Sequence, residues 1–599
     1  MNLESTCRRN IFRRQFFFDR AARFVSCGAG FVSLATLAAI FVFLAVLSLP
    51  LFVQGQWGQI LSATWRPYQG LYGVLPMVVG SLALSVSAFT LTYPVGIGVC
   101  LFICGPWGGA LRRATLAVVT FMTAIPTVVY GFVSVFLLIP LVKKVLGGSG
   151  PSLLAAGLTL ALLVLPTVVL FLHEAMREAE ARTRLTSASL GFSPLQALLL
   201  VVLPGSGAGL RTAAIMGYCR ALSDTLIPLM LAGNAPQFPD SFFDSVRTLT
   251  AHIALVVATD NSSPAFHSLF ACGLILFSVS LAVQAAVRAG NNVRLVEGRR
   301  LTLLAFLAAR PWCRAFIFAW SALSSALVIG AIGALLVFLL VRSLPVMDLR
   351  LFFGDAPALA AILGREPVWD GLFSACAGTV VLVVLASLMA IPAGIGGGIA
   401  LSQYLHGPWG RALGFSANAL AGVPSIVMGL FGFSLIIFLR HTVAPESNTC
   451  LLLSAVCIAL LVLPYTVNAT AQALESLPED LRLLGPSLGM TSWQSLRRIL
   501  LPAASPGMLG GVVLSMGRAA EDTAVILLTG VVATGGLPRG LFEKFEALPF
   551  TIYYLAGQYQ SRADLNKGFG AALTLLGLTV LLYGCARALQ TGMERNWRR

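Results

Sequence analysis

Five charged residues lie close together within two largely apolar stretches of this sequence. They are Arg220 and Asp224 in the first stretch, and Arg518, Glu521 and Asp522 in the second. An ionised side chain at the centre of a bilayer costs about 2.5–3.5 kcal/mol on insertion scales, so its presence there indicates a function. A guanidinium presents a planar fork of donors that suits a tetrahedral oxyanion. The five residues therefore predict a transient anion site, in which the arginines attract the ion and the carboxylates prevent tight binding.

The spacing within each group predicts how the arginines are held when no anion is bound. Asp224 follows Arg220 by four residues, and Asp522 follows Arg518 by the same interval. Residues four apart lie on one face of a helix, so each arginine is expected to pair with its own aspartate. The alternative interpretation is a structural ion pair near the outer end of a span, which holds helices together.

The sequence contains no motif for catalysis. A Gly-x4-Gly-Lys-Ser/Thr loop is absent, so ATP hydrolysis is expected in a separate subunit. No Ser/His/Asp set or pair of carboxylates is spaced for bond cleavage. The 5 histidines and 11 cysteines show no metal-ligand spacing. We therefore expect a protein that is not an enzyme and that holds no metal or cofactor.

Long apolar blocks make up most of the chain. Of its 599 residues, 57% are hydrophobic and 11% are charged. Each block reaches the roughly 20 residues that a helix needs to cross a bilayer, and backbone groups in lipid must bond within the segment. The net charge of +16 does not indicate nucleic-acid binding, because arginines gather beside the blocks as cytoplasmic anchors do. These anchors are Arg8, Arg9, Arg13, Arg14, Arg20 and Arg23, then Arg288, Arg294, Arg299, Arg300, Arg310 and Arg314, then Arg587, Arg595, Arg598 and Arg599.

The sequence repeats itself at a shift of 298 residues, which indicates a tandem duplication. The residues that recur at this shift include Pro94 and Pro392, Pro126 and Pro424, Leu163-Val164-Leu165-Pro166 and Leu461-Val462-Leu463-Pro464, Arg220 and Arg518, and Asp224 and Asp522. Six apolar blocks fall in each half. We predict spans at 27–53, 74–104, 114–142, 152–172, 207–232 and 266–288, and at 315–341, 371–401, 412–439, 450–470, 507–532 and 568–586. An even number per half gives both halves the same orientation, with both termini in the cytoplasm.

The stretches 173–206 and 471–505, which we call the coupling loops, carry a second repeated pattern. Leu190 and Gly191 precede nine residues and then Val201-Val202-Leu203-Pro204, while Leu488 and Gly489 precede nine residues and then Ile499-Leu500-Leu501-Pro502. Glycine permits a turn and proline suits the start of a helix. Each loop is therefore predicted to form a helix, a glycine turn and a second short amphipathic helix. Such a unit could transmit a movement of a soluble partner to the membrane helices. The alternative interpretation is an ordinary interfacial helix pair.

This pattern resembles the EAA loop in the membrane subunits of binding-protein-dependent ABC importers, which docks in a groove of the ATPase subunit. The usual Glu-Ala-Ala is replaced by Leu185-Thr186-Ser187 and Leu483-Leu484-Gly485. Other segments resemble the phosphate-specific pair of permeases, whose members carry Arg-x-x-x-Glu where this chain has Arg-x-x-x-Asp. Those segments are Ala124 to Gly131, Gly422 to Gly429, Asp244 to Ala254 in one outer loop, and Leu548 to Ala556 in the other.

The resemblance implies an all-α membrane protein with about twelve transmembrane helices, arranged as two parallel six-helix ABC-importer permease repeats in a bacterial inner membrane. It implies phosphate as the cargo, an ATP-binding subunit, expected as a homodimer, and an extracytoplasmic phosphate-binding protein. The expected divisions are a cytoplasmic segment 1–26, a first permease domain 27–288, a connector 289–313, a second permease domain 314–588 and a cytoplasmic tail 589–599. The alternatives are a permease for sulfate, molybdate or tungstate, and a secondary transporter, which would need no coupling loops.

Overall fold

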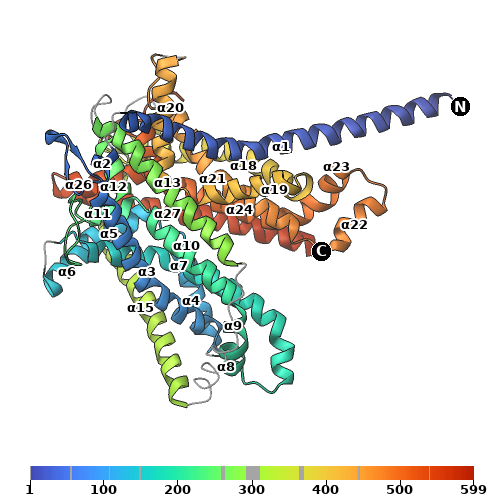
Figure 1. The fold of residues 1–599 in the computed structure, drawn as a ribbon, viewed down its shortest axis with the longest axis horizontal. Helices are drawn as coiled ribbons and strands as arrows, with labels where there is room; N and C mark the ends of the chain where they lie inside the picture. The colour runs from blue at the N-terminus through green and yellow to red at the C-terminus, as the bar shows by residue number, and fades with distance from the viewer. Residues whose placement is uncertain are drawn as a thin grey trace.

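The computed structural model describes residues 2–53, 57–106, 108–147, 150–257, 264–291, 311–362, 368, 370–442, 445–538 and 540–598. Nearly all of these residues form helices, joined by short turns (Figure 1). In this part of the chain, eleven helices are long and apolar enough to cross a bilayer, and a pair bent by 67° makes a twelfth. The prediction of an all-α membrane protein with about twelve spans is confirmed. Most of the predicted connector, 292–310, lies outside the described residues.

The elements of the first half follow the predicted blocks, with several additional breaks. They are α1 (Asn2–Val53), α2 (Trp57–Ile60), β1 (Trp65–Arg66), η1 (Pro67–Gln69), β2 (Leu71–Tyr72), α3 (Leu75–Cys104), α4 (Gly109–Met122), α5 (Thr127–Phe136), α6 (Leu138–Leu146), α7 (Leu153–Ser189), α8 (Pro194–Ala197), η2 (Leu198–Val202), α9 (Leu203–Gly205), α10 (Gly207–Ser223), α11 (Leu226–Leu231), α12 (Leu249–Val256) and α13 (Pro264–Asn291). The two strands pair antiparallel, Trp65 opposite Tyr72, in a small hairpin.

The second half repeats this order of helices. Its elements are α15 (Pro311–Ser343), η3 (Leu344–Val346), α16 (Leu349–Phe353), α17 (Ala358–Ile362), α18 (Phe373–Ile399), η4 (Ala400–Tyr404), α19 (Gly407–Ala421), α20 (Ser425–Thr442), α21 (Leu451–Glu475), α22 (Glu479–Ser487), α23 (Ser492–Ser495), η5 (Leu496–Leu500), α24 (Leu501–Glu521), α25 (Ala524–Thr529), α26 (Leu548–Gln558) and α27 (Arg562–Arg598).

The first span of each half packs on the other half. Helix α1 lies against α18 and α19 of the second half as well as α13 of its own, and α15 lies against α3 as well as α27. The two large buried clusters accordingly mix both halves: Leu335 of α15 joins the core built around α7, and Leu44 of α1 joins the core built around α21. The two repeats are therefore interlocked and are not two separate bundles set side by side.

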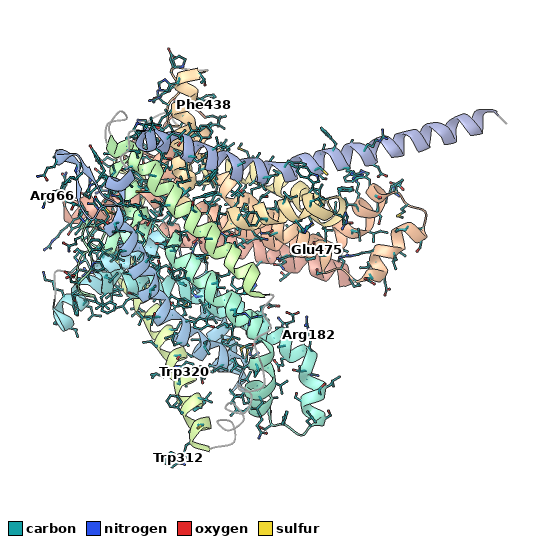
Figure 2. The ribbon with its side chains drawn as sticks, in the orientation of Figure 1. Arg66, Arg182, Trp312, Trp320, Phe438 and Glu475 are labelled. Atoms are coloured by element: carbon teal, nitrogen blue, oxygen red, sulfur yellow. The ribbon has the colours of Figure 1, made fainter. Side chains whose placement is uncertain are left out.

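The helices diverge from one end of the molecule. Figure 1 shows two groups that meet near α2, α5, α11, α12 and α26, which we call the closed end, and separate toward α8 and α9 on one arm and α22 and α23 on the other, which we call the splayed end. Figure 2 places Arg66 at the closed end, and Arg182 and Glu475 toward the splayed end. The two coupling loops thus lie at the tips of two different arms.

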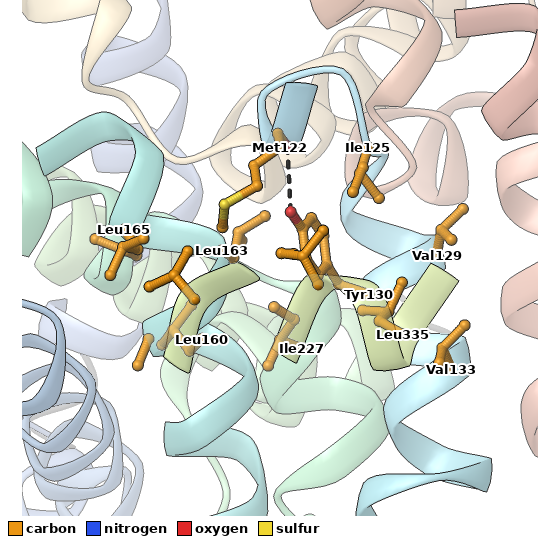
Figure 3. Packing of buried hydrophobic residues seen from close by; sticks show 14 of the residues in the cluster. Met122, Ile125, Val129, Tyr130, Val133, Leu160, Leu163, Leu165, Ile227 and Leu335 are labelled. Carbon is orange, nitrogen blue, oxygen red and sulfur yellow. Dashed lines mark hydrogen bonds between the residues drawn. The ribbon is translucent and has the colours of Figure 1, made fainter. Parts of the chain in front are cut away.

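The third apolar block of each half is broken, and our prediction of continuous spans at 114–142 and 412–439 was wrong. Helix α4 ends at Met122 and α5 begins after Pro126, which adopts an extended conformation (φ −60°, ψ 143°). Carbonyls freed by the break are paired: the Tyr130 hydroxyl donates to the Met122 oxygen at 3.2 Å (Figure 3), and the Thr579 hydroxyl of α27 donates to the Ala124 oxygen at 3.0 Å. The matching break separates α19 from α20 at Pro424.

The fifth blocks are broken as well, contrary to the predicted spans 207–232 and 507–532. Helix α10 ends at Ser223 and α24 ends at Glu521, and the aspartate that follows each helix is extended, with ψ of 137° at Asp224 and 113° at Asp522. Short helices α11 and α25 follow these breaks, and Figure 1 places α11 at the closed end. Each break places polar backbone groups in the interior of the bundle.

Glycines let the fourth and fifth spans of each half approach closely. A Cβ on Gly209 of α10 would overlap the Cβ of Ala175 of α7, and a Cβ on Gly507 of α24 would lie 2.9 Å from the Cβ of Ala473 of α21. Small residues at such crossings are the usual means by which membrane helices pack.

We expect Gly209→Ala to lower the apparent melting temperature of the purified protein, because overpacking a helix contact costs about 1–3 kcal/mol. The matched control is Gly207→Ala in the same helix, where no atom lies within 4 Å of the added Cβ. Equal melting temperatures for the two variants in a thermal scan in detergent would contradict the contact.

Candidate functional site

The breaks in the third and fifth blocks of both halves meet around one small cavity. It is lined by six pairs of residues, each pair separated by the 298-residue shift of the duplication. These pairs are Thr127 and Ser425, Arg220 and Arg518, Ser223 and Glu521, Asp224 and Asp522, Thr225 and Thr523, and Leu226 and Ala524. The structure therefore brings together all five charged residues that the sequence singled out, with the two halves contributing equally.

The aspartates have a different local role from the one that their spacing predicted. Asp224 and Asp522 stand just after the ends of α10 and α24, and each accepts a hydrogen bond from a backbone N–H of the next short helix: Ile227 N donates to Asp224 Oδ2 and Val525 N to Asp522 Oδ1, both at 3.0 Å. Aspartate is a strongly preferred residue for capping helix N-termini. The shorter carboxylate in place of glutamate thus fits a position that must cap α11 or α25.

The two arginines are held differently. Arg518 lies 3.7 Å from Asp522 Oδ2, and its Nη2 donates to the Ser425 hydroxyl at 3.4 Å. Arg220 comes within ion-pair distance, 4.0 Å, of no carboxylate in the described part of the chain. The expected pairing of each arginine with its own aspartate is thus present in the second half and absent in the first. One guanidinium in the cavity remains without a counter-ion in direct contact.

Several polar atoms around the cavity are buried without a hydrogen-bond partner. They are the hydroxyls of Thr225 and Thr523, Nε of Arg518 and one carboxylate oxygen of Glu521. Leaving such groups unpaired costs about 1–3 kcal/mol each, so a polar ligand that satisfied them would be favoured. The residue types that line the cavity offer charge and hydrogen bonds to a ligand.

The cavity is too small for an oxyanion in this conformation. Its volume of about 20 Å³ suffices for about one water molecule. Entry of an ion with four oxygen atoms therefore requires this cavity to widen.

Sequence reasoning missed the hydroxyl groups of the site. Thr127 and Ser425 directly follow the prolines that break the third blocks, and Thr225 and Thr523 directly follow the capping aspartates. The signal that could have found them was their recurrence at the 298-residue shift beside a proline or a charged residue inside an apolar block.

The coupling loops adopt the same turn in both halves. Gly191 and Gly489 have φ of +74° and +68°, a left-handed conformation that favours glycine. After each turn, a hydroxyl residue caps the next short helix and a glutamine three residues later bonds back: Ser193 with Gln196, and Thr491 with Gln494. The first helix of the first loop is an unbroken continuation of α7, whereas the second loop has a separate helix, α22.

Leucines are exposed in each coupling loop at equivalent positions. Leu190 and Leu488, which precede the glycines, are 66% and 62% exposed, and Leu185 and Leu483 are 82% and 61% exposed. The other predicted loop residues, Leu203, Pro204, Leu501 and Pro502, are half-buried where the chain enters α10 and α24. Sequence reasoning did not assign the leucines at 185 and 483 a role, although they replace the glutamate of the EAA pattern.

The N-terminal helix holds the second coupling loop. Asp19 of α1 accepts hydrogen bonds from Trp493 N at 2.8 Å and from the Thr491 hydroxyl at 3.2 Å. A carboxylate at the start of a short helix satisfies free N–H groups and favours the helix dipole. The first half thus fixes the loop of the second.

We expect Asp19→Ala to raise amide hydrogen exchange at residues 491–495 about tenfold, since a lost helix cap costs about 1 kcal/mol or more. Asp19→Asn keeps an acceptor oxygen and should exchange nearly as slowly as the original protein. Unchanged exchange in Asp19→Ala, measured by mass spectrometry, would show that the contact contributes nothing to the order of the loop.

The closed end is ordered by polar contacts within its loops. Glu546 accepts from Gly535 N and Gly536 N, both at 2.8 Å, and Arg247 Nε donates to the Asn234 oxygen at 2.8 Å. Burial raises the pKa of the Glu546 carboxyl and lowers the pKa of the Arg247 guanidinium. Residues 244–254 and 548–556, whose sequence resembles outer loops, fold back largely as α12 and α26 against this end.

Comparisons with known proteins agree with the duplicated architecture. A family model described as binding-protein-dependent transport system inner membrane component matches the chain twice, over residues 96–290 and 390–599. A probable ABC transporter permease protein, YqgH, of Bacillus subtilis is 30% identical over 284 residues, which are 46% of this chain and 91% of that protein.

Two relatives are named as phosphate transport system permease proteins. The phosphate transport system permease protein PstA of Mycobacterium leprae is 34% identical over 224 residues, covering 37% of this chain and 71% of that protein. The phosphate transport system permease protein PstC 1 of Mycobacterium bovis is 28% identical over 270 residues, covering 41% of this chain and 79% of that protein. Since each relative is largely spanned by less than half of this chain, the chain has the length of about two of them. With two matches to one family model that together cover more than half of its residues, the chain belongs to the family of binding-protein-dependent transport system inner membrane components.

Proposed function

We propose that this chain is the complete membrane pathway of an ATP-driven importer of inorganic phosphate. The observation that carries the proposal is the cavity between the halves, where Arg220 and Arg518 line one space together with five hydroxyl groups and three carboxylates. The two arginines would bind the oxygens of phosphate, and the hydroxyls would donate further hydrogen bonds. The names of two relatives, the phosphate transport system permease proteins PstA and PstC 1, support this cargo.

The charges that line the cavity suit transient binding of phosphate better than tight binding. Two guanidiniums face three carboxylates, because Glu521 stands where the first half has Ser223. A site in a transport pathway must attract its ion and also release it. The carboxylates of Asp224, Asp522 and Glu521 would compete with phosphate for the two guanidiniums and so favour its release.

The energy for the cycle would come from a separate ATP-binding subunit, a homodimer in our proposal. The two coupling loops, with their exposed leucines, lie at the tips of the two arms. An ATPase dimer that closes on ATP would bring these tips together, and the closed end would then open toward an extracytoplasmic phosphate-binding protein. We infer that the splayed end is cytoplasmic, in a bacterial inner membrane. Both chain termini lie toward that end in Figure 1, which supports this orientation.

The test is uptake of radiolabelled phosphate into right-side-out vesicles that enclose ATP and the partner ATPase, with the phosphate-binding protein added outside. We expect ATP-dependent uptake that unlabelled phosphate competes for and that equal concentrations of sulfate and molybdate do not. Strong competition by sulfate or molybdate would reject phosphate as the cargo. Uptake that persists without the ATPase would reject the ATP-driven mechanism.

A further inference from the structure

A second, larger cavity lies in the first half, apart from the cavity between the halves. Its volume is about 300 Å³, and it is lined by Cys104 at the end of α3, Arg112 and Leu116 of α4, and His173, Arg177 and Glu180 of α7. It shares no residue with the pathway cavity. A space of this size falls at the lower end of the range for small-ligand sites.

The cationic side chains of this cavity have no partner. Arg112 and Arg177 form no side-chain hydrogen bond and no ion pair within the described residues, although Glu180 lines the same space. By contrast, Arg182 of α7, two residues beyond Glu180 and not part of the cavity lining, is paired with Glu178 on the surface. Two free guanidiniums beside an imidazole and a single carboxylate give the cavity a net positive charge.

This positive charge belongs to the first half alone. At the 298-residue shift, the positions of Cys104, His173 and Arg177 are held in the second half by Ser402, Ala471 and Glu475. A charge needed only to anchor a span would be expected in both copies. The reversal from arginine to glutamate indicates that the cluster serves a purpose that the shared architecture does not require.

We propose that this cavity binds a phosphate group, either as free orthophosphate or as the headgroup of an anionic lipid. Both ligands present the same oxygens to the paired guanidiniums of Arg112 and Arg177, with His173 as a third donor. Basic pockets between transmembrane helices are known to hold anionic headgroups. The cavity is a binding site between α3, α4 and α7 and is not part of the transport pathway.

The experiment compares three variants in nanodiscs, all in an Arg220→Ala/Arg518→Ala background so that ions bound in the pathway cavity do not contribute. One arm measures binding of radiolabelled orthophosphate in pure phosphatidylcholine. The other measures retention of phosphatidylglycerol by native mass spectrometry. We expect Arg112→Gln/Arg177→Gln to weaken binding at least tenfold in one arm, which identifies the source of the phosphate group. The matched control is Arg182→Gln, which removes one charge from the same helix outside the cavity and should bind as before.

Glu180→Gln provides a test in the opposite direction. Removing the one carboxylate that lines the cavity should strengthen binding severalfold in the same arm, a gain that a misfolded protein would not show. Equal binding by the double arginine variant and the Arg182→Gln control in both arms would overturn the proposal, as would weaker or unchanged binding by Glu180→Gln. Because neither arm measures transport, failure here leaves the proposed importer function untouched.

Discussion

Replacing Arg220 or Arg518 by alanine is expected to reduce ATP-driven phosphate uptake to about 1% or less of the original rate. Each guanidinium would supply charge-assisted hydrogen bonds worth about 1.5–3 kcal/mol apiece. Loss of two such bonds corresponds to a decrease of at least a hundredfold, since about 1.4 kcal/mol is a factor of ten. The two single variants should be similarly impaired, because the residues occupy equivalent positions around one cavity.

Controls must separate a lost binding group from a damaged fold. Arg518 neutralises Asp522 at 3.7 Å, and removing one partner of a buried pair costs about 3–5 kcal/mol. Uptake is therefore normalised to the amount of assembled complex that co-purifies with the ATPase. Arg220→Lys and Arg518→Lys keep the charge but lose the planar fork, so intermediate uptake is expected. Arg113→Ala removes an exposed arginine bonded only to its own helix, at Gly109 O, and should transport normally. Normal uptake in both alanine variants would remove the arginines from the pathway.

The second large effect is expected at the tips of the arms. Leu190→Asp combined with Leu488→Asp should weaken binding of the ATPase at least a hundredfold and abolish its stimulation. Burial of a leucine side chain contributes about 1.5–3 kcal/mol, and both leucines are more than half exposed before docking. Each single variant should retain partial binding, because the two loops would occupy separate grooves of an ATPase dimer.

The control for this pair is Leu190→Met with Leu488→Met, a swap that nearly conserves volume and apolar character. Affinity is measured by titrating labelled ATPase into nanodiscs that contain each variant. If the double aspartate variant binds the ATPase with unchanged affinity, the loops are ordinary interfacial helices and the motor must dock elsewhere.

The spans and the duplication could be predicted from the sequence because they depend on local composition and on a constant shift. The breaks could not, because a proline alone does not decide them. Pro94 and Pro166 lie inside continuous helices, α3 and α7, whereas Pro126 ends one helix and begins another. The difference is tertiary: the carbonyls released near Pro126 find donors on Tyr130 and on Thr579, the latter 455 residues from Ala124.

The charged residues that line the cavity could be singled out from their types. Their predicted pairing, however, is present only in the second half. A spacing of four fits a helical ion pair and equally fits an aspartate that ends one helix and caps the next. Arg518 and Asp522 do both, and Arg220 and Asp224 do only the second. The packing of α1 and α15 against the opposite half could not be predicted either. Both helices are apolar on most sides, so their hydropathy does not specify which helix they contact.

The packing of α1 against the second half has a consequence for biosynthesis. Helix α1 ends at Val53, but much of the surface that it covers, on α18, is not translated until residue 373. At about 5–20 residues per second, the ribosome needs roughly 15–60 s to reach it. Throughout that interval one side of the nascent helix must face lipid or an insertion factor. Folding of the amino-terminal repeat therefore cannot be completed before the carboxy-terminal repeat is synthesised. A nascent chain that stalled between the two repeats would leave α1 without its contacts on α18.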